Sequence, residues 1–300
     1  MAGLLFAAFS ACTAGLADAQ PPDPQPPVQP PTVQQPAREA APPQPSIELD
    51  QTLVTLSTTQ PLKRHHGYFR LTHRFARDLR QGDFGNLASD LFSLDNGAII
   101  GLEYRYAVTS RLQAGVHRSI LGKTIVTFGR FDALRQGDGR PFGLSVGASI
   151  EGQNNLRQDR QPGVSATLSH VHGTWLALYA NPTYVHNAHT ETLRLLHEGH
   201  THDVPGADDA DASTAIDTFF VGLGTRVRLR ESVSTVVEFA PRVSGYKPAR
   251  ADWDAGIEKL TRGHVLQLNF GNNFNSTPGM IARGGSDHDV YMGFNLSRKF

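Results

Sequence analysis

From residue 67 onward, apolar and polar residues alternate with a period of two, the spacing of a strand with two different faces. The clearest run covers residues 98–108, where one face is apolar and the other carries Glu103 and Arg105. A soluble sandwich alternates in the same way, so one strand does not decide the architecture. The number of strands and the lengths of their connections carry more information.

We predict twelve such strands, each of roughly 9 to 13 residues, which is enough for a tilted strand to cross an outer membrane. The expected strands begin near Gly67, Gly97, Arg111, Lys123, Phe142, Gly163, Thr174, Ile216, Val233, Asp252, His264 and His288. The fold class that this pattern predicts is all-β: an antiparallel transmembrane β-barrel of about 12 strands, preceded by a disordered Pro-rich N-terminal segment.

The connections between these strands are of two kinds. Most even-numbered connections are tight, such as Thr109-Ser110 and His172-Gly173, whereas most odd-numbered ones are long, such as residues 76–96 and 186–213. Outer-membrane barrels have short periplasmic turns and long external loops. An even number of strands then predicts that the N- and C-termini are both in the periplasm.

Charged residues lie on the polar faces of the predicted strands. A charge that faces lipid at the bilayer midplane costs about 2–4 kcal/mol, so we expect these side chains to face the lumen. They either line a water-filled path or pair with one another and fill the barrel. The lumen-facing set is Glu103, Arg105, Arg226, Arg228, Glu238 and Arg242.

The sequence before the strands divides into two parts. Residues 1–19 are short, apolar and end in Ala17-Asp18-Ala19, which predicts a cleaved signal peptide. Residues 20–62, whose first part is rich in Pro and Gln, are expected to be a disordered periplasmic segment, and residues 63–300 the barrel. Cys12 is the only cysteine, and signal cleavage removes it, so no thiol chemistry is expected in the mature protein.

The composition limits the classes of binding partner that we expect. The 28 basic and 28 acidic residues cancel, so the chain has no general attraction for nucleic acid. The expected partners are outer-membrane lipids and the barrel-assembly machinery. The last strand supplies the sorting signal for that machinery, because apolar residues alternate along it and it ends on an aromatic residue; its key positions are Phe294, Leu296 and Phe300.

Several segments resemble an uncharacterised family of bacterial outer-membrane β-barrel proteins, a domain of unknown function. The resemblance covers about residues 67–300 and implies location and fold, with no activity. It rests on Thr72-His73-Arg74-Phe75, Ile100-Gly101-Leu102-Glu103-Tyr104, Gly115-Val116-His117-Arg118-Ser119 with Lys123-Thr124, Arg262-Gly263-His264-Val265-Leu266-Gln267-Leu268, and Gly293-Phe294-Asn295-Leu296-Ser297-Arg298.

A histidine cluster in the longest loop is the candidate metal site. Imidazoles followed by aspartates suit zinc, copper or nickel, but the His-Glu-x-x-His spacing of a zinc protease is absent, and a solvated polar loop has the same composition. The candidate ligands are His186, His189, His197, His200 and His202.

An outer-membrane hydrolase is the rival class. Ser169 lies beside His170 and His172, and His117 is two residues from Ser119. Residues two apart on one strand are about 7 Å apart, too far for a nucleophile to bond its base, and no Gly-x-Ser-x-Gly elbow is present. We therefore expect that the protein is not an enzyme and that it binds no cofactor. His73 and His264 are interpreted as polar residues at the rim.

The function predicted from sequence is a narrow channel or a membrane-organising barrel of the cell outer membrane, with unassigned substrate. The alternative is a surface barrel that captures a divalent metal or another ligand through residues 186–213. Single-channel conductance separates these two hypotheses.

Overall fold

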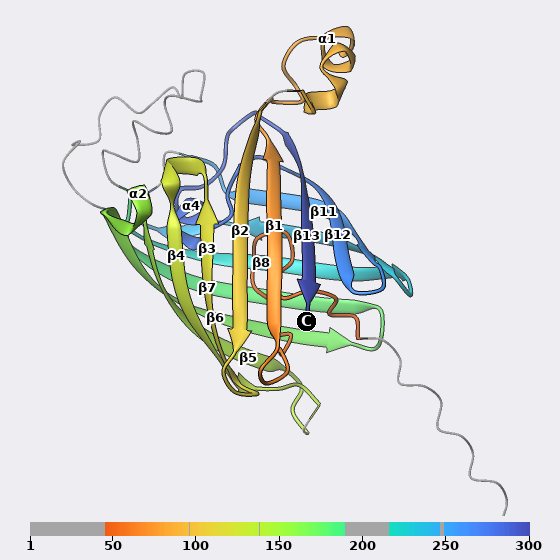
Figure 1. Ribbon diagram of the computed structural model, residues 1–300, viewed down its shortest axis with the longest axis vertical. Coiled ribbons are helices and arrows are strands. Elements are labelled where there is room, and N and C mark those ends of the chain that lie inside the picture. The colour runs from red at the N-terminus through yellow and green to blue at the C-terminus, as the bar shows by residue number, and fades with distance from the viewer. Residues whose placement is uncertain (1–45, 96, 138, 190–215, 247–248) are drawn as a thin grey trace, which may run out of the picture. The chain divides into compact units, whose positions relative to one another are not determined.

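The computed structural model describes residues 46–300, except for residues 96, 138, 190–215 and 247–248. These residues form one antiparallel sheet that closes on itself (Figure 1). Its strands are β1 (Gly67–Phe75), β2 (Ala98–Ala107), β3 (Leu112–Ser119), β4 (Ile125–Leu134), β5 (Gly143–Gly152), β6 (Gln158–His172), β7 (Leu176–His189), β8 (Ile216–Arg230), β9 (Val233–Ala240), β10 (Arg242–Ser244), β11 (Asp252–Leu260), β12 (His264–Gly271) and β13 (Tyr291–Lys299).

The sheet closes because the first and last strands pair with each other. β1 pairs with both β2 and β13, and β8 pairs with β7 and with β9. The short β10 continues β9 beyond Pro241 and stays paired with β8. Proline has no N–H to donate, so the ladder breaks there and one strand appears as two. The described sheet is thus a closed barrel of twelve strands, and the predicted fold class is confirmed.

The expected strand starts agree with the structure within three residues, except at one place. β6 begins at Gln158, five residues before the expected Gly163, and part of the expected loop is strand. Gln161 and Pro162 already pair with β5, so the pairing register of the neighbour extends the strand beyond its alternating pattern.

Short helices lie only in connections among the described residues. They are α1 (Phe84–Ser89), α2 (Gln153–Leu156), α4 (Pro278–Arg283) and the 3-10 turns η1 (Leu91–Ser93) and η2 (Leu121–Lys123). No helix in this part of the chain is long and apolar enough to cross a membrane.

The two ends of the barrel differ. The turn end carries Phe300, Gly67 and tight connections such as residues 173–175, where Gly173 adopts a positive φ of 57°. The loop end carries the connection with α1 and the one with α4. Most connections alternate between short and long as the sequence pattern predicts. The exceptions are the five-residue links between β3 and β4 and between β5 and β6, and the eight-residue link between β4 and β5.

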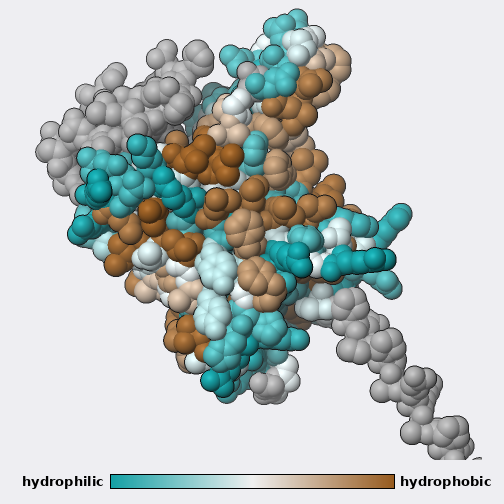
Figure 2. Space-filling model, in the orientation of Figure 1, coloured by the Kyte–Doolittle hydropathy of each residue, from teal (hydrophilic) through white to brown (hydrophobic). Residues whose placement is uncertain are grey.

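The outer wall is apolar. Leu102, Tyr104 and Tyr106 of β2 are exposed, and so are Leu266, Leu268 of β12. Their neighbours in sequence point inward and are buried. Figure 2 shows hydrophobic residues gathered over the wall on this face, with hydrophilic residues toward the ends. A row of exposed apolar side chains around a closed sheet is the surface that a bilayer requires.

One expectation is wrong. The expected disordered segment extends to residue 62, but residues 46–62 are ordered inside the barrel, and Leu53 and Val54 are fully buried there. Ile47, Leu49 and Leu56 are buried as well, because this part of the segment has apolar residues that the Pro-rich part lacks. Residues 1–45, with the expected signal peptide and most of the Pro-rich tract, lie outside the described residues.

Candidate functional site: the filled lumen

Residues 46–62, here called the plug, occupy the lumen (Figure 1). Their centre is a small hairpin in which Thr52 bridges Ser57. The Leu53 N–H donates to the Leu56 carbonyl at 2.8 Å, and the Thr58 N–H donates to Gln51 at 2.9 Å. With few internal hydrogen bonds, the hairpin depends on the barrel wall for most of its polar partners.

Glu238 of β9 holds the tip of the hairpin. Its carboxylate accepts the N–H groups of Val54, Thr55 and Leu56 at 2.5, 2.8 and 3.0 Å, and the Thr55 hydroxyl at 2.6 Å. Successive N–H groups that converge on one oxygen form an anion nest. The buried charge of Glu238 is therefore solvated by the plug backbone.

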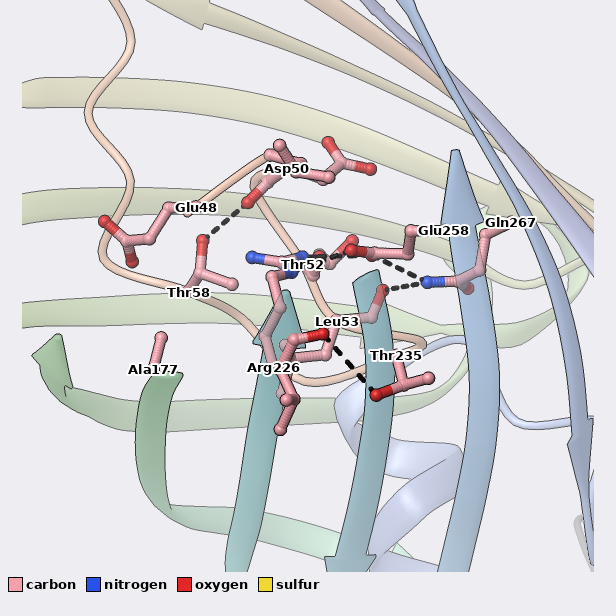
Figure 3. A network of polar contacts seen from close by, with 12 residues as sticks. Glu48, Asp50, Thr52, Leu53, Thr58, Ala177, Arg226, Thr235, Glu258 and Gln267 are labelled. Carbon is pink, nitrogen blue, oxygen red and sulfur yellow. Dashed lines mark hydrogen bonds and ion pairs between the residues drawn. The ribbon is translucent and has the colours of Figure 1, made fainter. Parts of the chain in front are cut away.

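A second wall charge is held by an ion pair. Arg226 of β8 bonds Glu258 of β11 through two contacts, at 2.7 and 3.0 Å, and neither side chain is exposed. Arg226 also donates to the Thr52 carbonyl at 3.0 Å, and Gln267 donates both to Glu258 and to the Leu53 carbonyl. Figure 3 shows Arg226, Glu258 and Gln267 converging on the plug.

Two glycines of β8 make room for the apolar side chains of the plug. A Cβ on Gly222 would lie 2.6 Å from Leu56, and one on Gly224 would lie closer still to Leu53. Real Cβ atoms do not approach other atoms so closely, so larger residues at these positions would exclude the plug.

The plug is also bound near the turn end. Ser297 donates to Asp50 at 2.7 Å, Lys299 donates to the Leu49 carbonyl at 3.1 Å, and Arg130 donates to the Gln60 carbonyl at 2.9 Å. Glu48 accepts from the Tyr179 hydroxyl at 3.2 Å. Burial is the main cause that raises the pKa of Glu48 above its usual value, although its side chain stays partly exposed.

The loop between β12 and β13 fills the lumen from the loop end. Thr277 caps α4, and Glu151 of β5 accepts both the Thr277 hydroxyl and the Gly279 N–H at 2.8 Å. Ile281 of α4 packs in one buried cluster with Leu56 of the plug and Phe220 of β8. The plug and α4 thus meet inside the barrel.

A cavity of about 110 Å³ remains between the plug, α4 and the wall. One side of it carries the buried side chains of Arg70, Arg105 and Arg130. The opposite side is hydroxyl-rich and comes from β5, β6 and β7, whose lumen positions are small; the lining residues there include Ser145, Ser149, Ser165, Thr167, Asn181 and Thr183.

The model of the family described as "Membrane bound beta barrel domain (DUF5777)" matches residues 50–300. The chain belongs to this family. The match includes the plug from Asp50 onward, so this barrel domain is longer than the predicted 63–300. The predicted resemblance to an outer-membrane β-barrel family of unknown function is confirmed.

No curated protein matches the chain. Among solved structures, it is similar to the NanC porin (TM-score 0.48, 7% identity, 78% of this chain and 100% of that chain). It is also similar to an outer-membrane channel from Pseudomonas putida F1 (0.44, 11%, 80% and 97%) and to Acinetobacter baumannii outer membrane protein Omp33 (0.40, 11%, 80% and 100%). At TM-scores below 0.5, these similarities transfer no substrate or activity to this membrane-bound barrel.

The predicted lumen charges of this barrel lie as follows. Glu103 and Arg105 are buried and 2.5 Å apart, Arg226 pairs with Glu258, and Glu238 holds the plug. Arg228 and Arg242 are half-buried, and Arg242 lies against Gly284, the C-cap residue of α4. These charges pair with one another or bind the plug inside the lumen, and a cavity remains beside them. Whether they line a water-filled path stays a prediction.

The predicted metal ligands fall mostly on residues that the structure does not describe. His197, His200 and His202 lie outside the described residues, as does the side chain of His189. His186 is half-exposed and forms an ion-pair contact with Asp217 at 2.7 Å. Among the described residues, no group of three or more His, Cys, Asp or Glu side chains could hold a metal. The metal hypothesis stays a prediction.

The hydrolase candidates are not brought together. Ser169 points into the lumen and contacts Thr59 of the plug, whereas His170 and His172 are exposed.

His117 instead lies 3.2 Å from the Ser276 hydroxyl and 3.7 Å from Glu103. This order resembles a Ser-His-acid set, but Nδ1 of His117 has no hydrogen bond to a described residue, and Glu103 is held by Arg105. A general base needs an orienting bond, which this set lacks.

The remaining predicted positions lie on the outer wall or at the rim. His73 stacks on Phe294 with ring centroids 4.7 Å apart, and Phe300 is 56% exposed at the turn end. Leu296 is half-buried, and His264 begins β12 after its turn. Their role in sorting stays a prediction.

Sequence reasoning missed the plug and its wall partners, among them Arg70, Glu258 and Gln267. The signal was present: Ile47, Leu49, Leu53, Val54 and Leu56 form an apolar cluster that a solvated tether does not need.

Proposed function

We propose that this chain is a narrow outer-membrane channel that its own plug holds closed. The observation that carries the proposal is the way the plug is bound. Its hairpin is held at the wall by Glu238, Arg226 and Gln267 through hydrogen bonds to the plug backbone. Such bonds can exchange for bonds to water one at a time as the plug moves.

The wall that the plug covers is polar. Beneath it lie arginines, glutamates and the hydroxyl groups of β5 and β6. Once the plug moves, these groups would line a water-filled path, as the lumens of outer-membrane channels do. A barrel that only organises the membrane does not need a polar wall behind the plug that fills its lumen.

The proposed orientation places the turn end and both termini in the periplasm, with the α1 and α4 loops outside. Short turns at one end and long loops at the other support this orientation. The plug is bound near this end, where Lys299 donates to the Leu49 carbonyl, so a periplasmic partner could act on the plug from there. Among the described contacts, none favours the metal-capturing alternative.

The test is conductance in planar bilayers. Glu238→Gln removes the charge that the three N–H groups solvate and leaves the side-chain size nearly unchanged. We expect wild-type protein to stay mostly closed, and E238Q to open more often. Glu231→Gln, in the exposed turn between β8 and β9, is the matched control and should behave as wild type.

A variant that lacks residues 46–62 gives the stronger result. It should conduct steadily, and heat-modifiable migration on gels would show that its barrel is folded. A folded variant without the plug that passes no current would refute the channel and favour a membrane-organising barrel.

A further inference from the structure

The cavity between the plug, α4 and the wall has an uneven charge. Its lining includes three arginines and one glutamate. Arg105 is paired with Glu103, and Arg130 is paired with Asp132 at 3.0 Å. Arg70 of β1 forms no ion pair with any described residue. Arg70 therefore faces the cavity without an ion pair to a described residue, because its cross-strand neighbour Glu103 is bound to Arg105.

Arg70 is also short of hydrogen-bond partners. Its side chain is 4% exposed and donates to the Val54 carbonyl, but its Nε has no partner among the described residues. A buried guanidinium with a free N–H is costly, and an anion is the ligand that removes this cost most completely.

A second unpartnered donor lies on the opposite side of the barrel. Asn181 of β7, six strands from β1 around the ring, is 4% exposed and lines the same cavity. Its Oδ1 accepts the Thr167 hydroxyl at 2.8 Å, which fixes the amide, and its Nδ2 has no partner among the described residues. Thr52 of the plug lines the cavity with a hydroxyl that is also without a described partner.

The remaining lining suits a ligand with hydroxyl groups. Serine and threonine side chains both donate and accept, so they match a polyol better than an apolar group. They cover the walls that β5 and β6 supply; those lining this cavity are Ser145, Ser149, Ser165 and Thr167.

We infer that this cavity is a binding site for a small hydroxylated carboxylate. The carboxylate binds Arg70, and the hydroxyl groups bind Asn181 and the serine and threonine wall. The volume of about 110 Å³ suits a molecule of a few carbon atoms rather than a long chain or an oligomer. The plug supplies part of the lining, so the ligand and the closed plug stabilise each other.

The test uses full-length mature protein in detergent, with calorimetric titration of glycerate at constant ionic strength. Glycerol removes the charge, propionate removes the hydroxyl groups, and chloride supplies a bare anion. We expect saturable binding of glycerate, weaker binding of propionate, and none of glycerol or chloride in the same range.

Two variants test whether glycerate binds in this cavity. Arg70→Gln should weaken glycerate binding by about tenfold or more, the effect of losing one charge-assisted hydrogen bond. Arg262→Gln, in an exposed turn, is the matched control and should not change it. Asn181→Leu keeps the branching of the side chain and removes its polar atoms. Asn181 has no described hydrogen bond to the plug, so this variant tests the site even where R70Q loosens the plug; it should weaken binding several-fold.

The inference is overturned when wild-type protein shows no saturable glycerate binding, when glycerol or chloride binds as well, or when N181L and R70Q both bind as wild type. Because titration in detergent requires no conduction, this result is independent of the bilayer experiment. A barrel that never opens can still bind glycerate, and a plugged channel can fail to do so.

Discussion

At the scale of single residues, the lumen is stabilised by charges that are fully removed from water. The Arg226–Glu258 pair has no exposed side-chain surface, and each partner has further polar contacts, to Thr52 and Gln267. A buried pair with all its hydrogen bonds made is tolerated, but one partner alone is not. Loss of one partner is therefore costly mainly because it leaves the other charge buried and unpaired, and the net energy of the intact pair matters less.

We expect Arg226→Met to lower the free energy of unfolding by about 3–5 kcal/mol, because Glu258 is left buried without a counter-ion. Urea unfolding in detergent measures this. The double variant R226M/E258Q should recover part of the loss, and Arg262→Met at the exposed turn should change stability by less than about 0.5 kcal/mol. A loss below about 1 kcal/mol for R226M would contradict the burial of the pair.

At the scale of elements, β8 and the plug fit each other by shape. Gly222 and Gly224 are on the lumen side of a strand whose outward residues, such as Leu223, are exposed. The alternation of β8 indicates which face is inside, but not why that face needs glycine. The reason is the pair of plug leucines, which come from a segment about 170 residues earlier in the chain.

We expect Gly224→Val to displace the plug and leave the barrel folded, because its Cβ would overlap Leu53. Overpacking of this kind costs about 1–3 kcal/mol, so amide hydrogen exchange at residues 53–56 should become roughly 5- to 100-fold faster.

Gly129→Val is the matched control for this variant. A Cβ there would have its nearest neighbour at 3.9 Å, and the position is on the exposed face. Equal exchange in both variants would show that the glycines do not serve the plug.

At the scale of the whole molecule, closure depends on the two ends of the sheet. Gly67 donates to the Phe300 carbonyl at 2.7 Å and accepts its N–H at 3.0 Å, so the last residue completes the seam between β1 and β13. The Phe300 ring is mostly exposed on the outer side of the barrel. It therefore adds little to closure of the sheet and is accessible to another protein.

We expect Phe300→Ala to reduce the amount of barrel assembled in the outer membrane several-fold, with little effect on refolding in detergent. The backbone bonds of the seam survive this change, whereas the proposed sorting signal does not. Immunoblots of outer-membrane fractions and heat-modifiable migration measure the two quantities. Phe142→Ala, another exposed aromatic near the turn end, is the control. Normal assembly of F300A would remove Phe300 from the sorting signal.

The sequence by itself determined the strands, their number and their two faces. These features depend on period-two alternation and on local turns, which are properties of neighbouring residues. The inward placement of Glu103, Arg105, Arg226 and Glu238 follows from the same alternation, because a charge that faces lipid is costly. The single exception, the early start of β6, comes from pairing with β5.

Only the tertiary structure decided what fills the barrel. Leu53 contacts Gly224, Glu238 collects the N–H groups of residues 54–56, and Arg70 and Asn181 meet one cavity from opposite walls. Each of these contacts joins residues that are far apart in the chain, and alternation carries no information about such distances. Which residues a lumen charge contacts depends on closure of the barrel, because closure brings the first strand, the last strand and the plug together around one lumen.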